Sequence, residues 1–227
     1  MKLKKIIFIT TILIFISTYT LAHEGIFINR DISSIEKSWK IEDIQHSKAI
    51  YSQLQEELQV DYYRFQGLQE EEYYSQVLIP QIEGNHNFMV TKLLIGENLP
   101  SINEQYNDIV PSGYGAIPVE PGNSREEFFE PFTQTSYYKK QQFSFQLEED
   151  GTYYIAVFNS HGQTGKYVLT LGEEEDMSFM ELITYPVTWF KVNWWFNPFR
   201  PIVMMIIIGG LIFLCIKVIQ GIRNKKS

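Results

Sequence analysis

The chain has 227 residues, of which 27 are acidic, 19 are basic and one is a cysteine. All the acidic residues lie between Glu24 and Glu181, whereas seven of the basic residues lie at the two ends of the chain. The middle of the chain therefore repels phosphate, which excludes nucleic acid as a partner and favours cations or basic partners, although such acidity also serves plain solubility. Because Cys215 lies in an apolar C-terminal stretch, thiol catalysis and cysteine-held metals are excluded for the middle segment.

The first 22 residues have the composition of an export signal. Lysines stand at positions 2, 4 and 5, an apolar run covers 6–16, and the small residue Ala22 precedes His23. This order predicts a signal peptide over 1–22 that is cleaved before His23. An uncleaved membrane anchor is the alternative, because Thr20, three places before the cleavage point, is larger than the usual small residue there.

Strand-like stretches begin after an N-terminal extension, 23–47. They are rich in Tyr, Val, Ile and Leu, and each is bounded by glycine, proline or a polar cluster. Later stretches alternate strictly, as where Phe143, Phe145 and Leu147 face one way and polar residues face the other. The predicted strands are 48–54, 60–66, 72–79, 88–95, 142–147, 153–157 and 167–171. We expect the last three to be consecutive antiparallel neighbours, and all seven to form two packed antiparallel sheets, a β-sandwich over 48–172.

Segment 96–140 breaks this pattern. It holds five prolines and four glycines, and its apolar runs are only two or three residues long, so we expect a long inserted loop. The segment is nevertheless too aromatic for a solvated linker. The favoured interpretation is that its rings cover a sheet edge or the open end of the sandwich, and the alternative is a ligand-binding platform. The candidate ligand-binding residues are Tyr106, Tyr114, Phe128, Phe129 and Phe132.

Three motifs in this region resemble a known family. They are Asp-Tyr-Tyr-Arg-Phe at 61–65, Gly-Thr-Tyr-Tyr-Ile-Ala-Val at 151–157 and Gly-Gln-Thr-Gly-Lys-Tyr-Val-Leu-Thr-Leu at 162–171. Together they resemble the bacterial pre-peptidase C-terminal domain, with segment 96–140 as an insertion. The resemblance implies a small jelly-roll-like β-sandwich, usually an accessory module of secreted enzymes, whose relatives bind collagen, polysaccharide or calcium. The chain holds no protease domain, so the accessory role is not carried over.

The C-terminal part predicts a membrane anchor. A juxtamembrane aromatic segment, 173–200, begins with a capping box at Ser178 and Glu181 that predicts a short helix ended by Pro186, and its aromatic remainder is expected along the membrane surface. An apolar stretch of transmembrane length follows at 201–222, and a basic tail at 223–227. Basic residues behind the apolar stretch and aromatic residues ahead of it predict that the body of the chain is extracytoplasmic and the C-terminus is inside.

A metal site is suggested at the predicted cleavage point. A mature N-terminal His23 offers its α-amine and imidazole to one metal ion, a pair that suits Cu(II). Further ligands would come from His46, His86 or His161. Calcium is the other candidate cation, but the spaced carboxylates of a calcium loop are missing from the sequence, so its ligands would come from separate loops.

Catalysis is not expected. The four histidines stand beside no recognised nucleophile motif, and carboxylate pairs are too common in so acidic a chain to single out a site. We therefore expect a membrane-tethered, non-catalytic binding module for a partner protein, a cell-envelope glycan or a cation. One alternative is a copper-binding protein that uses His23. Another is a structural subunit of a membrane complex, with Gly209 and Gly210 allowing close approach of helices.

Overall fold

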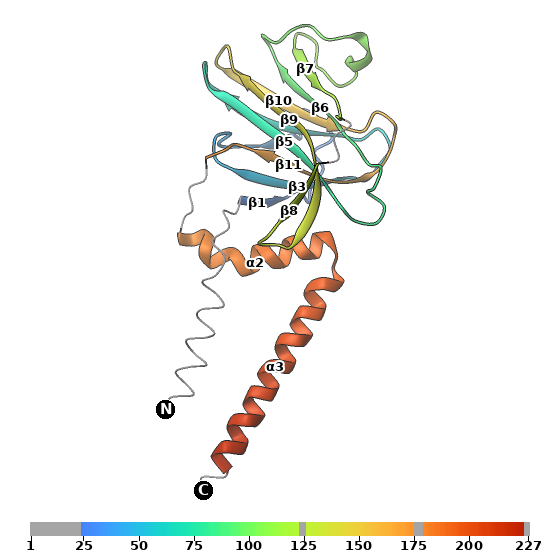
Figure 1. Ribbon diagram of the computed structural model, residues 1–227. Coiled ribbons are helices and arrows are strands. Elements are labelled where there is room, and N and C mark those ends of the chain that lie inside the picture. Colours follow the sequence, from blue (N-terminus) through green and yellow to red (C-terminus); the bar gives the residue numbers. More distant parts are fainter. Residues whose placement is uncertain (1–23, 123–125, 175–178, 225–227) are drawn as a thin grey trace. The chain divides into compact units, whose positions relative to one another are not determined.

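The computed structural model describes residues 24–122, 126–174 and 179–224, and the chain divides into two compact units between Glu181 and Leu182. The predicted signal peptide, 1–22, and His23 lie outside the described residues. The first unit is built of strands, and the second consists of helix (Figure 1).

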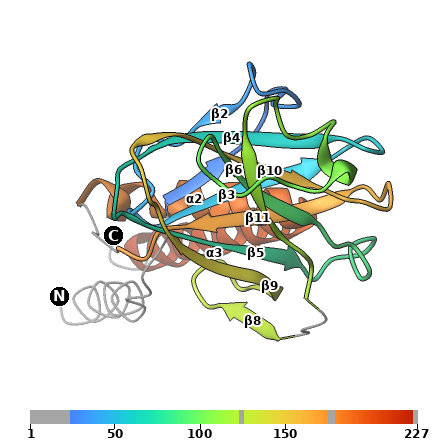
Figure 2. The same cartoon turned by 90° about the horizontal axis from the view of Figure 1, so that it is seen from above.

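The strands form two sheets, and the predicted β-sandwich is confirmed (Figures 1 and 2). Neighbouring strands are antiparallel except at one edge of each sheet, where β1 runs parallel to β3 and β2 runs parallel to β4. The six-stranded sheet has the order β1 (Glu24–Phe27), β3 (Lys48–Leu54), β11 (Gly165–Leu171), β5 (Glu72–Pro80), β9 (Thr135–Gln146) and β8 (Glu127–Glu130). The five-stranded sheet has the order β2 (Trp39–Lys40), β4 (Val60–Gly67), β10 (Gly151–Phe158), β6 (Thr91–Gly96) and β7 (Gly115–Val119).

Aromatic and branched side chains from the inner faces of both sheets form the main core. Phe65 of β4 stacks on Tyr73 of β5 at a centroid distance of 5.5 Å and on Tyr153 of β10 at 5.6 Å. A buried ring removes roughly 150–250 Å² from water, so a few such contacts supply much of the energy that holds the sheets together. Cys215 is a free cysteine, so within the described residues the core is packed without a disulfide.

The predicted pairing of the last three strands is wrong. β9 pairs with β5 and β8, β10 with β4 and β6, and β11 with β3 and β5, so none of the three is a neighbour of another. The chain crosses from one sheet to the other after β9 and again after β10. Alternation in a sequence shows which side of a strand is buried, but it does not specify the neighbour to which the backbone bonds.

Segment 96–140 is more ordered than a loop. It contains β7, β8, the start of β9 and the short 3-10 helix η1 (Glu104–Tyr106), while the extension 23–47 contains β1 and β2. Strands β1, β2, β7 and β8 all lie at sheet edges, where only one side of a strand needs a partner. Pro118 is tolerated in β7 for the same reason, because an edge strand can leave one donor out of the ladder.

Helix α2 (Phe179–Phe196) begins at the end of the first unit and continues into the second, which also contains α3 (Phe199–Asn224). Pro186 lies inside α2, so its predicted role as the end of a short helix is wrong. The dihedral φ of proline is compatible with a helix. Proline has no backbone N–H, so α2 lacks one hydrogen bond at this position and still continues past it. Asn197 separates the helices: its side chain accepts a hydrogen bond from the Phe199 backbone N–H at 3.0 Å, which caps the start of α3.

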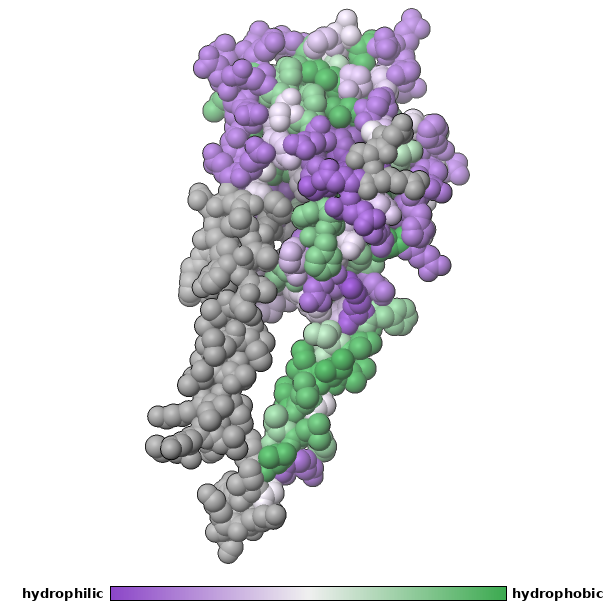
Figure 3. Space-filling model, viewed as in Figure 1, coloured by the Kyte–Doolittle hydropathy of each residue, from purple (hydrophilic) through white to green (hydrophobic). Residues whose placement is uncertain are grey.

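One stretch of α3 is long and apolar enough to cross a membrane. It covers Phe199–Val218, 20 residues with a mean hydropathy of 2.5. Its side chains form a continuous apolar surface in the space-filling view (Figure 3). A helix of this length rises about 30 Å, which matches the hydrocarbon thickness of a bilayer.

Candidate functional site

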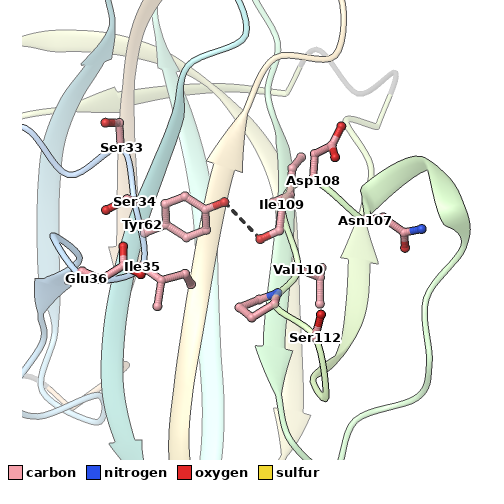
Figure 4. Close-up of a pocket in the computed structure, with 11 residues that line it drawn as sticks. Ser33, Ser34, Ile35, Glu36, Tyr62, Asn107, Asp108, Ile109, Val110 and Ser112 are labelled. Atoms are coloured by element: carbon pink, nitrogen blue, oxygen red, sulfur yellow. Dashed lines mark hydrogen bonds between the residues drawn. The ribbon is translucent and has the colours of Figure 1, made fainter.

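A polar hollow of about 480 Å³ lies on the outer side of the five-stranded sheet. Residues 33–36 form one wall, residues 107–112 form the other, and Tyr62 of β4 lies between them (Figure 4). The walls come from the N-terminal extension and from the inserted segment, which are far apart in the sequence. The sheet brings them together.

The first wall is fixed by local hydrogen bonds. Asp31 accepts hydrogen bonds from the backbone N–H of Ser33 at 3.0 Å and from its hydroxyl at 2.6 Å, which is the pattern of an Asx turn. The Tyr62 N–H donates to the Ile32 carbonyl at 2.9 Å and ties this wall to β4. Ile35 packs against the outer apolar cluster of the sheet, so this wall is held by both hydrogen bonds and packing.

The second wall follows η1. The carbonyl of Tyr106 accepts hydrogen bonds from the N–H groups of Ile109 and Val110, both at 2.9 Å. These bonds close one further turn of chain directly after η1. The Tyr106 ring is 6% exposed and stands edge-on to Phe158 of β10 at 6.1 Å. Its hydroxyl donates to Glu120 at 2.5 Å. Tyr106 therefore anchors this wall and does not face a ligand.

Tyr62 joins the two walls. Its hydroxyl donates to the Ile109 carbonyl at 3.0 Å (Figure 4). Burial, with a smaller contribution from the negative charge of Glu36, raises the pKa of Tyr62 to about 12. The phenol is therefore neutral at physiological pH and acts as a hydrogen-bond donor that holds the hollow open.

The hollow is negatively polarised. Glu36 lies on one wall and Asp108 on the other, with hydroxyls and an amide around them, and the lining holds no Lys, Arg or His. Hydrogen bonds from its own backbone N–H and from Ser34 hold the pKa of Glu36 below its usual value, so it is ionised over the physiological range. A cationic group that also donates hydrogen bonds suits such a lining.

The hollow does not activate Ser33 as a nucleophile. The hydroxyl of Ser33 donates to Asp31, but hydrogen bonds from Lys37 and Ser33 hold the pKa of Asp31 well below its usual value. So weak a base removes a serine proton poorly. The lining described above also provides no histidine to act in its place.

The five aromatic candidates do not form one platform. Tyr106 and Tyr114 pack over the five-stranded sheet, where the Tyr114 ring stands edge-on to Tyr154 at 6.0 Å. Phe128 and Phe129 lie on β8 of the six-stranded sheet, and Phe132 follows that strand. Phe129 is 56% exposed, whereas Phe128 is half-buried and tilts against Tyr137 at 6.3 Å. These rings therefore belong to two separate surfaces.

The histidine candidates are also divided. His46 precedes β3 and bridges to Glu174 after β11, while His86 and His161 lie in loops near the start of β11. The seven residues of β11 separate these ends by about 20 Å, so His46 cannot share an ion with the other two. Within the described residues, no three His, Cys, Asp or Glu side chains gather as for a metal ion. Copper binding at His23 stays a prediction.

The residues that line the hollow were not candidates from the sequence. Ser33, Ser34, Glu36 and Asp108 lie in irregular stretches with no apolar period, and polar residues there are typical of any surface loop. Only the tertiary contact of the two stretches through Tyr62 distinguishes them.

Comparison with known proteins gives structural matches only. Neither a family model nor a curated protein matches the sequence. The matching solved structures include PliG, a periplasmic inhibitor of g-type lysozyme, from Salmonella Typhimurium (13% identity, TM-score 0.32) and from Aeromonas hydrophila (11%, TM-score 0.36), each over 66% of this chain and 98% of the other. Another is the pre-peptidase C-terminal domain of a Bacillus anthracis collagenase (13%, 66% and 96% covered, TM-score 0.27). That domain belongs to the family that the sequence motifs resemble. At such scores the matches carry no inference about a ligand or a partner.

Proposed function

We propose that this protein is a non-catalytic binding module on the outer side of a membrane, and that the hollow over the five-stranded sheet receives a cationic side chain of a basic partner protein. The observation that carries the proposal is that Glu36 and Asp108 lie on opposite walls of a hollow whose lining has no positive charge. α3 supplies the tether, and the body lies on the extracytoplasmic side.

The charge of the whole body supports a basic partner. Residues 24–174 contain 24 acidic and ten basic side chains. Such an excess of negative charge attracts basic proteins over several ångströms and raises the rate of encounter, while the hollow supplies the specific contact. The hollow, about 480 Å³ in volume, has room for one long side chain such as arginine.

The proposal is tested with two small probes of matched shape. Acetyl-arginine methylamide carries the charge, and acetyl-citrulline methylamide is the neutral analogue. We expect the arginine probe, binding with a dissociation constant on the order of millimolar, to shift the backbone amide signals of 33–36, 107–110 and 112 in NMR spectra of the full chain in nanodiscs. The citrulline probe is expected to leave them unmoved, because the carboxylates then find no charge to pair with.

The variant Glu36→Gln/Asp108→Asn is expected to lose the response to arginine, because it keeps the shape of the hollow and removes its charge. Glu83→Gln, a charge change in the loop after β5, is the matched control and should respond as the original chain does. Equal shifts from both probes, or an arginine response that survives in the double variant, would reject the site.

A further inference from the structure

The six-stranded sheet has an edge that is only half covered. β8 pairs with β9 from Thr135 to Tyr138, and the Lys139 N–H donates to the Glu126 carbonyl at 2.8 Å. Beyond this point β9 continues to Gln146 and, among the described strands, pairs only with β5. In the part of the chain that the structure describes, the other side of this half of β9 faces no strand.

The register shows which backbone groups are open. The Leu147 N–H donates to the Glu71 carbonyl at 2.9 Å, and Phe145 lies opposite Tyr73 and Phe143 opposite Ser75. Backbone groups in an antiparallel pair alternate between the two sides of a strand. Leu147, Phe145 and Phe143 therefore bond toward β5, and the N–H and C=O groups of Ser144 and Gln146 point to the open side.

Among the described residues of the first unit, no strand-blocking feature lies within Phe143–Gln146. Natural edges are often protected by lysine, proline or a bulge. The bulge in β9 lies opposite Ser75–Val77 and ends before Phe143, and the stretch Phe143–Gln146 contains neither a charge nor a proline. Phe143 and Phe145 stack on one another at a centroid distance of 6.3 Å and pack against the main core, which holds this part of the strand on the sheet.

A hollow of about 330 Å³ adjoins the open edge. It is lined by Glu70, Glu72, Ser144, Phe145 and Gln146. Glu70 has φ of 68°, and its N–H donates to the Leu147 carbonyl at 2.8 Å, so the turn before β5 is firmly held beside the strand. Neither Glu70 nor Glu72 takes part in an ion pair within the described residues.

We propose that the open edge of β9 binds an extended segment of a basic protein, which adds to the sheet as an extra strand. The outward groups of Ser144 and Gln146 bond to its backbone, and a Lys or Arg side chain of the segment enters the hollow between Glu70 and Glu72. Strand addition of this kind takes its affinity from the main chain and its specificity from side-chain pockets. A second copy of this chain fits less well, because it brings the same excess of acidic residues. This surface lies on the other sheet from the hollow at Tyr62 and does not depend on it.

The test uses the full chain in nanodiscs and the peptide acetyl-Thr-Val-Lys-Val-Thr-amide, with the same peptide carrying Glu in place of Lys as its partner probe. We expect the Lys peptide to bind and to protect the amides of Ser144 and Gln146 from hydrogen exchange. The Glu peptide is expected to bind at least about tenfold more weakly, because its carboxylate meets two others. Equal binding of the two peptides would overturn the role of the hollow.

Two variants at one position test the backbone contact. Ser144→Pro removes the outward N–H and leaves the bonds toward β5 in place, so we expect at least about tenfold weaker binding of the Lys peptide. Ser144→Ala keeps the N–H and should bind within about twofold of the original chain. Unchanged binding by a folded Ser144→Pro variant would overturn the proposal.

A second measurement needs no variant of the protein. N-methylation of the peptide at its central Lys, or at both Val residues, blocks donors on opposite sides of the same strand. Only one of the two methylated peptides should lose binding if the peptide adds as a strand, and equal effects of the two would contradict it. A concentration-dependent dimer that Ser144→Pro abolishes would assign the edge to a second copy and overturn the peptide proposal.

Discussion

The inner and outer faces of the five-stranded sheet are both covered, but in different ways. The inner face meets the other sheet strand on strand, and it buries the side chains of Asp61 and Lys92, each about 1% exposed. The outer face is covered by irregular chain that is held by a few anchors such as Tyr106 and Tyr62, and it leaves a polar hollow. The regularly packed inner face therefore contributes most to the stability of the fold, whereas the irregular layer on the outer face leaves room for a ligand.

Asp61 and Lys92 connect the two sheets in different ways: Asp61 accepts hydrogen bonds, and Lys92 donates them. Asp61 accepts hydrogen bonds from Ser52 at 2.8 Å, Tyr167 at 2.6 Å and Gln59 at 2.6 Å, and the Tyr167 hydroxyl is also 2.8 Å from that of Tyr63. Burial raises the pKa of Asp61 despite these bonds. Lys92, from β6, donates across the sandwich to the Ser75 hydroxyl at 2.5 Å and to carbonyls of β5 and β9.

The largest effect is expected from breaking the inner network. Asp61→Ala should lower the free energy of unfolding by about 3 kcal/mol, because it leaves buried hydroxyls of Ser52 and Tyr167 without their acceptor. Asp108→Ala on the outer layer is the matched control, with a change within about 0.5 kcal/mol. Urea denaturation of the two variants measures the difference. Similar losses from both would show that the two faces do not differ as described.

A second prediction concerns pH. Burial lowers the pKa of Lys92 to about 7 from an ordinary value of 10.5. Between these values the unfolded chain binds the proton and the folded chain does not, so stability is expected to rise from pH 7 toward pH 10 by up to about 1.4 kcal/mol per pH unit. Below pH 7 both states are protonated and this contribution to the slope vanishes.

Lys92→Met is expected to remove this part of the slope, as measured by urea denaturation at pH 7, 8 and 9. Lys40→Met, which changes an exposed lysine near Glu42, should keep the slope. A slope that persists in Lys92→Met would mean that Lys92 is not the titrating group.

The smallest effect is expected on the outer layer. Tyr106→Phe removes the hydroxyl that donates to Glu120 and keeps the buried ring, so we expect a loss of about 1 kcal/mol. Tyr114→Phe, whose hydroxyl donates to Glu97 at 3.2 Å on an exposed surface, should lose less. If Tyr114→Phe were the more damaging change in thermal unfolding, the anchor of the outer layer would have to be placed at Tyr114.

The strands were predictable, but their partners were not. The first four expected strands followed from their content of Tyr, Val, Ile and Leu and from the turn residues that bound them. The last three followed from alternation, as at Phe143, Phe145 and Leu147, since a half-buried strand needs this period. Edge strands such as β7 and β8 were missed, because an edge needs less apolar character and β7 carries Pro118. The hollow at Tyr62 was missed for a related reason, since its walls are polar stretches far apart in the sequence.

The sequence by itself determined the acidic body, the apolar helix of membrane length and the existence of a sandwich, because composition and period act locally along the chain. The tertiary structure alone decided that β9, β10 and β11 are not neighbours and that residues 33–36 meet residues 107–112. It also decided that half of β9 has no strand on its outer side among the described residues. Each of these depends on which distant segments share a sheet. That choice is made by the fit of whole faces to one another, which no local pattern contains.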